Sequence, residues 1–311
     1  MSEDTPQRSG EPGSPLLETE APYRHALVIG NPVAGRGRGG KAAEEIAEGL
    51  RRMGVGVELL LTRERGDALA RLRCLEPGTD LVVSVGGDGT LHEVFGGLID
   101  PEIPVGILPL GTANVLATEV GLPRDVHRAL EIFAAKKVVP IDVARVNGHL
   151  SFLVTGVGID AMATRRVEER RKGPITKWAY VEAVLRALKD YKVPRLEVEV
   201  DGERVEGEFG LVLVSNTINY GGILKMAQDT RMDDGLFEVY LFPGGSRRDL
   251  FAYALRGFLS RLPGGGCEMR RARSVKVRST SPVPYQVDGD YRGETPVEIE
   301  VADKQYHILV P

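Results

Sequence analysis

Short apolar stretches alternate with segments of helical periodicity between residues 23 and 120. We expect strands at residues 25–30, 55–62, 80–85 and 105–108. The helices expected after them cover residues 41–53, 67–74, 90–98 and a stretch ending near residue 120. A strand, a loop and a helix repeated in this way predict a parallel sheet covered by helices, with functional loops at the carboxyl ends of the strands.

The hydrophobic pattern changes after about residue 142, where apolar and polar residues begin to alternate. This alternation predicts antiparallel strands at residues 195–200, 208–214, 236–242, 275–278 and 297–301. Helical stretches are expected at residues 175–191 and 246–262. The chain is thus expected to comprise a disordered leader (1–22), an α/β domain (23–142) and a mainly antiparallel β-sandwich domain (143–311). The last segment is a candidate to return to the first domain.

The amino-acid composition excludes several classes of protein. Of the 311 residues, 42% are hydrophobic and 27% are charged, which excludes a wholly disordered chain. No apolar run approaches the roughly 18 residues of a membrane span. The two cysteines, Cys74 and Cys267, are far apart, and the N-terminus has no basic and apolar secretory signal. We therefore expect a cytoplasmic protein, and the isolated histidines argue against a zinc site.

Charge is unevenly distributed around the net value of −4. The leader is acidic, whereas residues 165–177 and 268–278 are strongly basic. Such segments are either solvated faces or surfaces that bind an anionic membrane. The sequence gives no sign of nucleic-acid binding, and it leaves open whether the chain is a monomer or a homodimer.

The first Gly-rich loop, residues 31–41, lies between a strand and a helix. Free backbone N–H groups and the helix dipole make such a place an anion site. The loop fits G-x-G-x-x-G, but no acid ends the next strand, and it fits G-x-x-x-x-G-K, but Ala42 replaces the Ser or Thr. The loop is therefore predicted to bind phosphate, although it matches neither standard motif.

Two further loops have the same setting. Residues 86–90 read Gly-Gly-Asp-Gly-Thr, and an aspartate among these glycines would repel phosphate unless a divalent cation bridges the two. Thr90 and Glu93 also fit a helix capping box. The third loop, residues 109–114, offers Thr112 to a nucleotide and Asn114 as a link between loops. Three such loops on neighbouring strand ends predict one shared crevice.

Taken in order, these motifs resemble the catalytic domain of the diacylglycerol kinase family. That group includes bacterial soluble lipid kinases and the sphingosine and ceramide kinases, and it shares its nucleotide fold with NAD kinases. The motifs that carry the resemblance are Asn31–Gly35, Gly87–Thr90, Leu110–Asn114, Arg171–Gly173 before Tyr180, Asn216 with Tyr220–Gly222, Asp233–Leu236 and Val287–Asp290. The resemblance covers about residues 25–305.

The resemblance implies that ATP sits on the loops of the first domain and that Mg²⁺ accompanies it. The implied nucleotide contacts are Asn31, Pro32, Val33, Ala34, Gly35, Thr62, Gly87, Asp88, Gly89, Thr90, Leu91, His92, Glu93 and Thr112. A lipid hydroxyl would attack the γ-phosphorus from the cleft between the domains, helped by a carboxylate.

Asp288 and Asp290 are the candidates for that carboxylate. The family usually has Glu at the third position of this turn, and Asp290 is about 1.5 Å shorter in reach. We expect Asp290 to be the catalytic base and Asp288 to be its partner. Without the resemblance, the same residues would read as a hydrophilic hairpin turn.

A structural magnesium site is also implied by the resemblance. Its ligands would be the carboxylate of Asp234 and the backbone carbonyls of Arg231 and Leu236, oxygen ligands that suit a hard cation. Many bacterial members have an aspartate where this chain has Val115, so the water-mediated link from this site to the nucleotide is in question. An Asp-Gly turn before a strand is the competing interpretation.

The predicted function is ATP-dependent phosphorylation of a membrane-derived lipid alcohol, with diacylglycerol as the leading substrate. A sphingoid or ceramide lipid is an alternative substrate. NAD kinase accounts for the Gly-Gly-Asp-Gly-Thr loop but not for the third loop or the C-terminal Asp-Gly-Asp turn. A non-catalytic lipid- or nucleotide-binding protein is the remaining alternative. The basic segments would dock the protein peripherally on anionic phospholipid, with the Trp178/Tyr180 helix over the lipid entrance.

Overall fold

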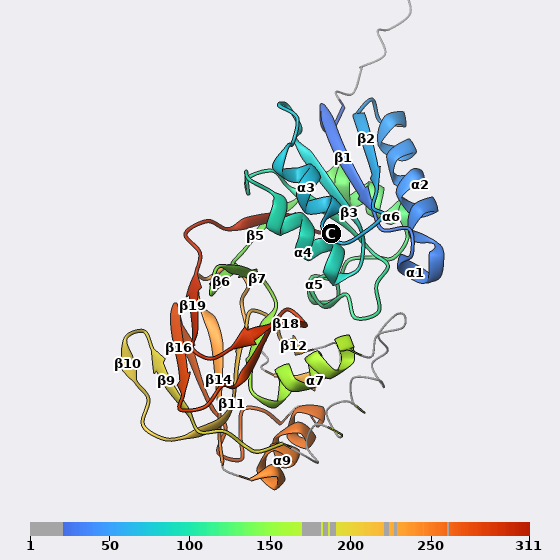
Figure 1. Ribbon diagram of the computed structural model, residues 1–311. Coiled ribbons are helices and arrows are strands. Elements are labelled where there is room, and N and C mark those ends of the chain that lie inside the picture. Colours follow the sequence, from blue (N-terminus) through green and yellow to red (C-terminus); the bar gives the residue numbers. More distant parts are fainter. Residues whose placement is uncertain are drawn as a thin grey trace, which may run out of the picture.

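The computed structural model describes residues 21–169, 182, 186, 191–220, 224–226, 229–244, 246–259 and 261–311. Most of the predicted leader and the predicted helix at 175–191, with Trp178 and Tyr180, lie outside the described residues. Figure 1 shows an α/β domain above a β-rich domain, with α4 and α5 on the side of the first domain that faces the second.

The first domain is built on a mostly parallel sheet of six strands in the order β2-β1-β3-β4-β20-β5. Its strands are β1 His25–Gly30, β2 Gly56–Leu61, β3 Leu81–Gly86, β4 Val105–Pro109, β5 Val138–Ile141 and β20 Tyr306–Leu309. The final strand, β20, pairs in parallel with β4 and antiparallel with β5, so the end of the chain is part of the first domain. Every residue of β3 is buried, as a central strand covered on both faces requires.

Helices cover both faces of this sheet. They are α1 Ala34–Gly37, α2 Gly39–Arg52, α3 Asp67–Arg73, α4 Asp88–Gly97, α5 Val115–Glu119 and α6 Val126–Ala135. In α2 the buried residues Ala43, Ile46, Ala47 and Leu50 recur at helical spacing and pack in the first core. The sequence pattern did not indicate α6, which Asp125 caps by accepting a hydrogen bond from the Arg128 N–H at 3.0 Å.

The second domain is dominated by a curled antiparallel sheet of twelve strands among the described residues. Its strands are β6 Ala144–Val146, β7 His149–Ser151, β8 Val154–Val157, β9 Leu196–Val200, β10 Glu203–Arg204, β11 Phe209–Ser215, β14 Phe237–Pro243, β15 Glu268–Ala272, β16 Ser274–Ser279, β17 Pro284–Val287, β18 Asp290–Glu294 and β19 Val297–Val301. Inward-facing residues of these strands, such as Val198, Val239 and Val277, form a second core. The α/β and antiparallel β architecture predicted from the sequence is confirmed.

The described part of the second domain also contains a small second sheet and two helices. Two short strands, β12 Asn219–Tyr220 and β13 Leu224–Lys225, pair with each other. Among the described residues, helices α7 Ile159–Glu169 and α9 Arg247–Phe258 contribute Ile159, Ala163 and Leu250 to one small hydrophobic cluster. Among the described residues, no helix is long and apolar enough to cross a membrane. Both cysteines are free: Cys74 is exposed and Cys267 is buried.

Candidate active site

The three predicted phosphate loops lie side by side because they follow the adjacent strands β1, β3 and β4. The loop after β1 is tied to the end of β3, where the Asn31 N–H donates to the Val85 carbonyl at 3.0 Å. The second is tied to the third, where the Leu110 N–H donates to the Gly86 carbonyl at 2.7 Å. The three loops therefore lie together at one edge of the sheet, and the shared crevice expected there stays a prediction.

Close backbone packing explains why Gly39 in the first loop is a glycine. A Cβ added to Gly39 would lie 2.0 Å from the Asn31 carbonyl oxygen, so only glycine lets α2 approach this strand end. Gly35 and Arg36 both have a φ of 60°, and the short helix α1 is kinked there. The Asn31 side chain accepts from the Val33 N–H at 3.2 Å and donates to Thr90 Oγ1 at 3.4 Å, which joins the first two loops.

The second and third loops touch through glycine backbone. A Cβ on Gly111 would lie 2.5 Å from Gly87 Cα, and a Cβ on Gly87 would lie 3.0 Å from Gly111 Cα. Asn114 closes its own loop by accepting from the Gly111 N–H and donating to the Gly111 carbonyl, each at 2.8 Å. A Cβ on Gly89 would meet nothing within 4 Å, so the second loop borders open space at this residue.

The capping box predicted for Thr90 and Glu93 is wrong. Helix α4 begins two residues earlier, at Asp88, with Gly87 as its N-cap and no side-chain capping bond. Thr90 is therefore inside the first turn, where its Oγ1 fills the space beside Gly86. A helix start without a capping side chain leaves backbone N–H groups for an anion.

Asp88 has a second task besides its predicted role near phosphate. Its Oδ1 accepts from the Val115 N–H at 2.8 Å, at the start of α5. Burial raises the pKa of Asp88, the hydrogen bond from Val115 lowers it, and the nearby Asp288 carboxylate raises it again. The carboxyl groups of Asp88 and Asp288 are therefore close enough to influence each other across the domain boundary.

The other predicted nucleotide contacts lie around these loops. The Thr62 N–H donates to the Gly30 carbonyl at 2.9 Å, which puts Thr62 beside the first loop. Thr112 is exposed in the third loop, and Val33 is 77% exposed in the first. Leu91 is buried in the first core, so its side chain faces away from the loops. Pro32, Ala34 and Glu93 are partly exposed.

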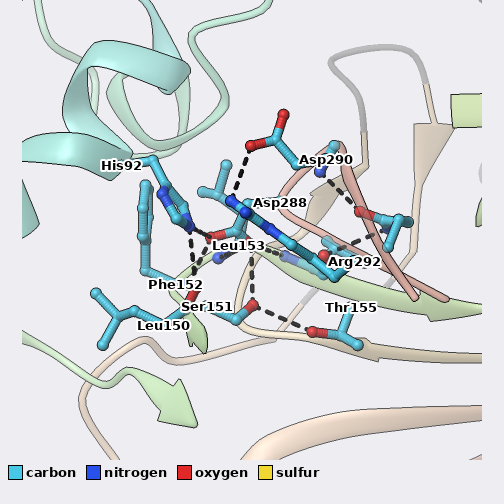
Figure 2. Close-up of polar contacts among 12 residues, drawn as sticks. His92, Leu150, Ser151, Phe152, Leu153, Thr155, Asp288, Asp290 and Arg292 are labelled. Atoms are coloured by element: carbon cyan, nitrogen blue, oxygen red, sulfur yellow. Dashed lines mark hydrogen bonds and ion pairs between the residues drawn. The ribbon is translucent and has the colours of Figure 1, made fainter. Parts of the chain in front are cut away.

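The Asp-Gly-Asp motif forms the turn between β17 and β18: Asp288 and Gly289 are its two loop residues, and Asp290 begins β18. Asp288 and Gly289 have positive φ values of 51° and 89°, as the favoured hairpin turns require. The Asp288 side chain is only 2% exposed, because it points into the second domain. Its oxygens accept from four donors at 2.9–3.0 Å, which are Ser151 Oγ and the N–H groups of Phe152, Leu153 and Val154 (Figure 2).

These contacts make Asp288 an anchor for the connection between β7 and β8. Burial raises the pKa of Asp288, while the His92 ring and the hydrogen bonds from Phe152, Ser151 and Leu153 oppose that shift. Its lone pairs are committed to the protein, so this carboxylate is poorly placed to accept a proton from a substrate.

Asp290 has the opposite environment. Its side chain is 30% exposed, and Oδ2 accepts from Arg292 Nη2 at 3.0 Å and from Arg65 Nη2 (Figure 2 shows the Asp290 and Arg292 side chains). Arg65 belongs to the first domain, three residues beyond Thr62, so this ion pair spans the two domains. Sequence analysis missed both arginines, because nothing in the local pattern marks them as partners of Asp290.

His92 joins α4 directly to the second domain. Its Nε2 lies 3.0 Å from the Leu150 carbonyl oxygen and 4.0 Å from Asp288 Oδ2 (Figure 2). One turn further along α4, Phe95 packs edge-on against Phe152 with ring centroids 4.9 Å apart. The helix that starts at the second phosphate loop therefore rests on the strand connection that Asp288 holds. The sequence suggested a nucleotide contact for His92 and gave no sign of this interdomain role.

The predicted magnesium loop folds against Asp142, near the link between the domains. Asp142 Oδ2 accepts from the Gly235 N–H at 2.7 Å, and the Asp142 N–H donates to the Met232 carbonyl at 2.6 Å. Asp234 Oδ1 accepts from the Leu236 N–H at 3.1 Å. The described residues contain no group of three or more His, Cys, Asp or Glu side chains that could hold a metal. A site made of Asp234 with the carbonyls of Arg231 and Leu236 stays a prediction, and its all-oxygen donors fit Mg²⁺.

Some motif residues of the second domain are described and others are not. Asn216 is fully buried and donates to the Asp142 carbonyl at 2.8 Å. The Tyr220 hydroxyl donates to Asp160 on α7. The predicted residues Arg171–Gly173, Tyr180 and Gly222 lie outside the described residues.

The glycine-lined edge of the parallel sheet and the acidic hairpin of the β-rich domain thus lie at the boundary between two domains. The family model of the diacylglycerol kinase catalytic domain matches residues 25–146, and that of the YegS C-terminal NAD kinase beta sandwich-like domain matches residues 153–310. The chain therefore belongs to the diacylglycerol kinase family, as the sequence motifs predicted, and is a kinase.

Individual relatives agree with this assignment. A protein named diacylglycerol kinase from Bacillus subtilis is 28% identical over 295 residues, which cover 93% of this chain and 97% of the relative. Another of that name from Staphylococcus saprophyticus is 26% identical, with 88% of this chain and 91% of the relative covered. The crystal structure of a putative diacylglycerol kinase from Bacillus anthracis has the same fold, with a TM-score of 0.74, 23% identity, and coverage of 93% of this chain and 97% of that chain.

Proposed function

We propose that this kinase transfers the γ-phosphoryl group of ATP to the hydroxyl of a membrane-derived lipid, with diacylglycerol as substrate and phosphatidate as product. Relatives that share nearly the full length of the chain are named diacylglycerol kinase. The substrate assignment rests on that likeness together with the chemistry of the site.

The observation that carries the proposal is the place of the Asp-Gly-Asp turn. It faces α4, whose first turn is the second phosphate loop, and Asp288 lies 4.0 Å from His92 on that helix. The adjoining Asp290 is exposed at the same boundary. An acid of the second domain is thus available opposite the loops that would bind polyphosphate.

In the proposed reaction, Asp290 accepts the proton of the attacking hydroxyl. The lipid oxygen forms a bond to the γ-phosphorus as the bond from that phosphorus to the β,γ-bridging oxygen breaks, and ADP keeps the electron pair. The loop N–H groups would bind the phosphates, and a bound Mg²⁺ would neutralise phosphate charge. Arg65 and Arg292 bind the Asp290 carboxylate and would hold it in place at the domain boundary.

A panel assay tests the proposal. Purified protein is incubated with radiolabelled ATP, Mg²⁺ and mixed micelles of diacylglycerol, sphingosine or ceramide, and separately with NAD in solution. We expect label in phosphatidate. Label in sphingosine or ceramide would assign a different lipid substrate to the enzyme. Label in NAD would establish an NAD kinase. ATP binding without any transfer would indicate a non-catalytic binding protein.

Peripheral contact with an anionic membrane is part of the proposal. In the predicted basic segment 268–278, Arg270, Arg271 and Lys276 are each paired with a glutamate of the same domain. The described basic residues of segment 165–177, Arg165 and Arg166, lie on α7.

Helix α9 offers a better surface for such contact. Phe251, Leu255 and Leu259 are spaced four residues apart at this helix and are 53%, 50% and 49% exposed, which makes an outward apolar ridge. Arg248 and Arg261 are exposed near the ridge and form no ion pair with any described residue. An apolar ridge with basic neighbours suits the headgroup region of an anionic bilayer.

A further inference from the structure

Gln286 is a buried amide on β17, two residues before Asp288. Its side chain is at the centre of three hydrogen bonds. Oε1 accepts from the Gly289 N–H at 2.7 Å, and Nε2 donates to Asp160 Oδ2 at 2.8 Å and to the Val154 carbonyl at 3.4 Å. With only 2% of the residue exposed, water cannot replace these partners. Gln286 therefore links the turn that carries Asp290 to Asp160.

Asp160 fixes which way the Gln286 amide points. It lies in the first turn of α7, is 6% exposed, and also accepts from the Tyr220 hydroxyl. An ionised carboxylate only accepts hydrogen bonds, so it binds the NH₂ end of the amide and not the oxygen end. The oxygen end is then directed to the Gly289 N–H.

The Gly289 peptide is the middle of the two-residue turn, and Asp290 follows it directly. Rotation of this peptide would move the Asp290 carboxylate away from the boundary with α4. Helix α7 supports the same hairpin a second time, because the Arg165 guanidinium lies over the Tyr291 ring at 5.2 Å from its centroid.

We infer that Gln286, oriented by Asp160, is a positioning residue that holds the Asp288–Gly289–Asp290 turn in the conformation needed for phosphoryl transfer. The inference rests on the proposed function, because it assigns Gln286 a role through Asp290. Neither residue touches substrate in this account. Their contribution is the placement of the base, and a displacement of about 1 Å can lower a rate by about a hundredfold.

Gln286→Glu tests the inference, because it keeps the shape of the side chain and makes its donor depend on pH. An ionised glutamate cannot donate to Asp160 and repels it. A protonated one can donate to Asp160 through its O–H and accept from the Gly289 N–H, as the amide does. Two facing carboxyl groups share a proton at a raised pKa, so lowering the pH restores the contact.

Other titratable groups face this pair. Among the described residues, Tyr220 and Tyr191 face Asp160, and burial raises the pKa of Tyr191. Asp288 lies on the turn itself, with His92 of α4 beyond it. All of these groups are present in both proteins, so their effects largely cancel when the kcat of the variant is divided by the kcat of wild type at each pH.

At pH 8, we expect the kcat of Gln286→Glu to be about tenfold to a hundredfold lower than that of wild type. At pH 6, the two kcat values should approach each other. KM for ATP should stay within twofold. Asp160→Asn should lower kcat without recovery at low pH, because its amide can also offer a donor to Gln286. Tyr253→Phe, which removes a buried hydroxyl bonded to the Pro243 carbonyl at 3.0 Å, is the matched control and should keep kcat.

Hydrogen exchange of the segment 284–292 provides a readout that does not need activity. At pH 8 this segment should exchange faster in Gln286→Glu than in wild type, and at pH 6 the two should agree. Equal kcat ratios at both pH values, or wild-type exchange at pH 8, would overturn the positioning role. If wild type labels no lipid, the proposed function fails, and the exchange comparison still decides the role of Gln286.

Discussion

Asp288 and Asp290, which flank Gly289 at the turn between β17 and β18, have opposite surroundings. Asp288 is buried and accepts from four donors, whereas Asp290 is exposed at the domain boundary and meets two arginines. The backbone reversal at Asp288 and Gly289 makes this possible, because both adopt positive φ. One carboxylate therefore holds the strand connection, and the other is partly exposed between two arginines, where we propose that it meets a substrate.

Replacing Asp288 tests its anchoring role. Asp288→Asn should lower the free energy of unfolding by about 2–4 kcal/mol, because the amide NH₂ replaces an acceptor with a donor facing backbone N–H groups. Urea unfolding at pH 7 measures this change. A variant as stable as wild type would show that the four hydrogen bonds contribute little.

Sequence patterns named candidate site residues but not the surroundings in which the structure places them. The Asp-Gly-Asp spacing led to both aspartates, but not to the burial of Asp288, which depends on the neighbouring strands. Arg65 could not be found, since it lies 225 residues from Asp290 in sequence. Gln286 and Asp160 were missed for a different reason. A lone polar residue in a strand or helix carries no periodic signal.

At the scale of elements, the contact between the loops after β3 and β4 depends on glycine. Gly111→Ala puts a Cβ 2.5 Å from the Gly87 backbone, which cannot move without separating the loops. ATP affinity should fall about tenfold or more, equivalent to about 1.4 kcal/mol, as measured by titration calorimetry. Gly96→Ala is the matched control, because its Cβ would make an ordinary 3.6 Å contact with Leu69. Equal losses in both variants would contradict the loop account.

The apolar ridge of α9 gives a second prediction at this scale. The double variant Phe251→Ser/Leu255→Ser should partition onto phosphatidylserine-containing vesicles at least about tenfold less than wild type, because two apolar side chains no longer insert. Ile99→Ser removes an apolar side chain that is 71% exposed on the first domain and should have no effect.

Vesicle flotation at low and high salt measures this partition, and wild-type binding should weaken with salt. Undiminished binding of the double variant would place the contact elsewhere. Sedimentation that changes from dimer to monomer in the double variant would instead assign the ridge to a homodimer interface.

Long periodic elements were predictable, and short ones were not. The five strands predicted in the second domain appear as β9, β11, β14, β16 and β19, with ends within one residue. Strands of two to four residues, such as β6, β12 and β17, are too short for a period of two to be recognised. They form because neighbouring strands supply hydrogen-bond partners, which is information from distant parts of the chain.

At the scale of the whole molecule, α4 unites the two domains. Its first turn is a phosphate loop, while His92 and Phe95 rest on the connection between β7 and β8. The return of β20 into the first sheet ties the domains a second time. This arrangement brings an acid of the second domain to the phosphate loops of the first, which the order of motifs in the sequence suggested but could not place.

A single-turnover transfer assay with Asp290→Ala tests the central claim most directly. With radiolabelled ATP and diacylglycerol micelles, label transfer should fall by about 10²–10⁴-fold, the usual contribution of a general base, while the dissociation constant for ATP stays within twofold of wild type. Asp290→Glu is the matched control and should retain most of the activity, because it keeps the carboxylate. Transfer by Asp290→Ala at the wild-type rate would contradict the account.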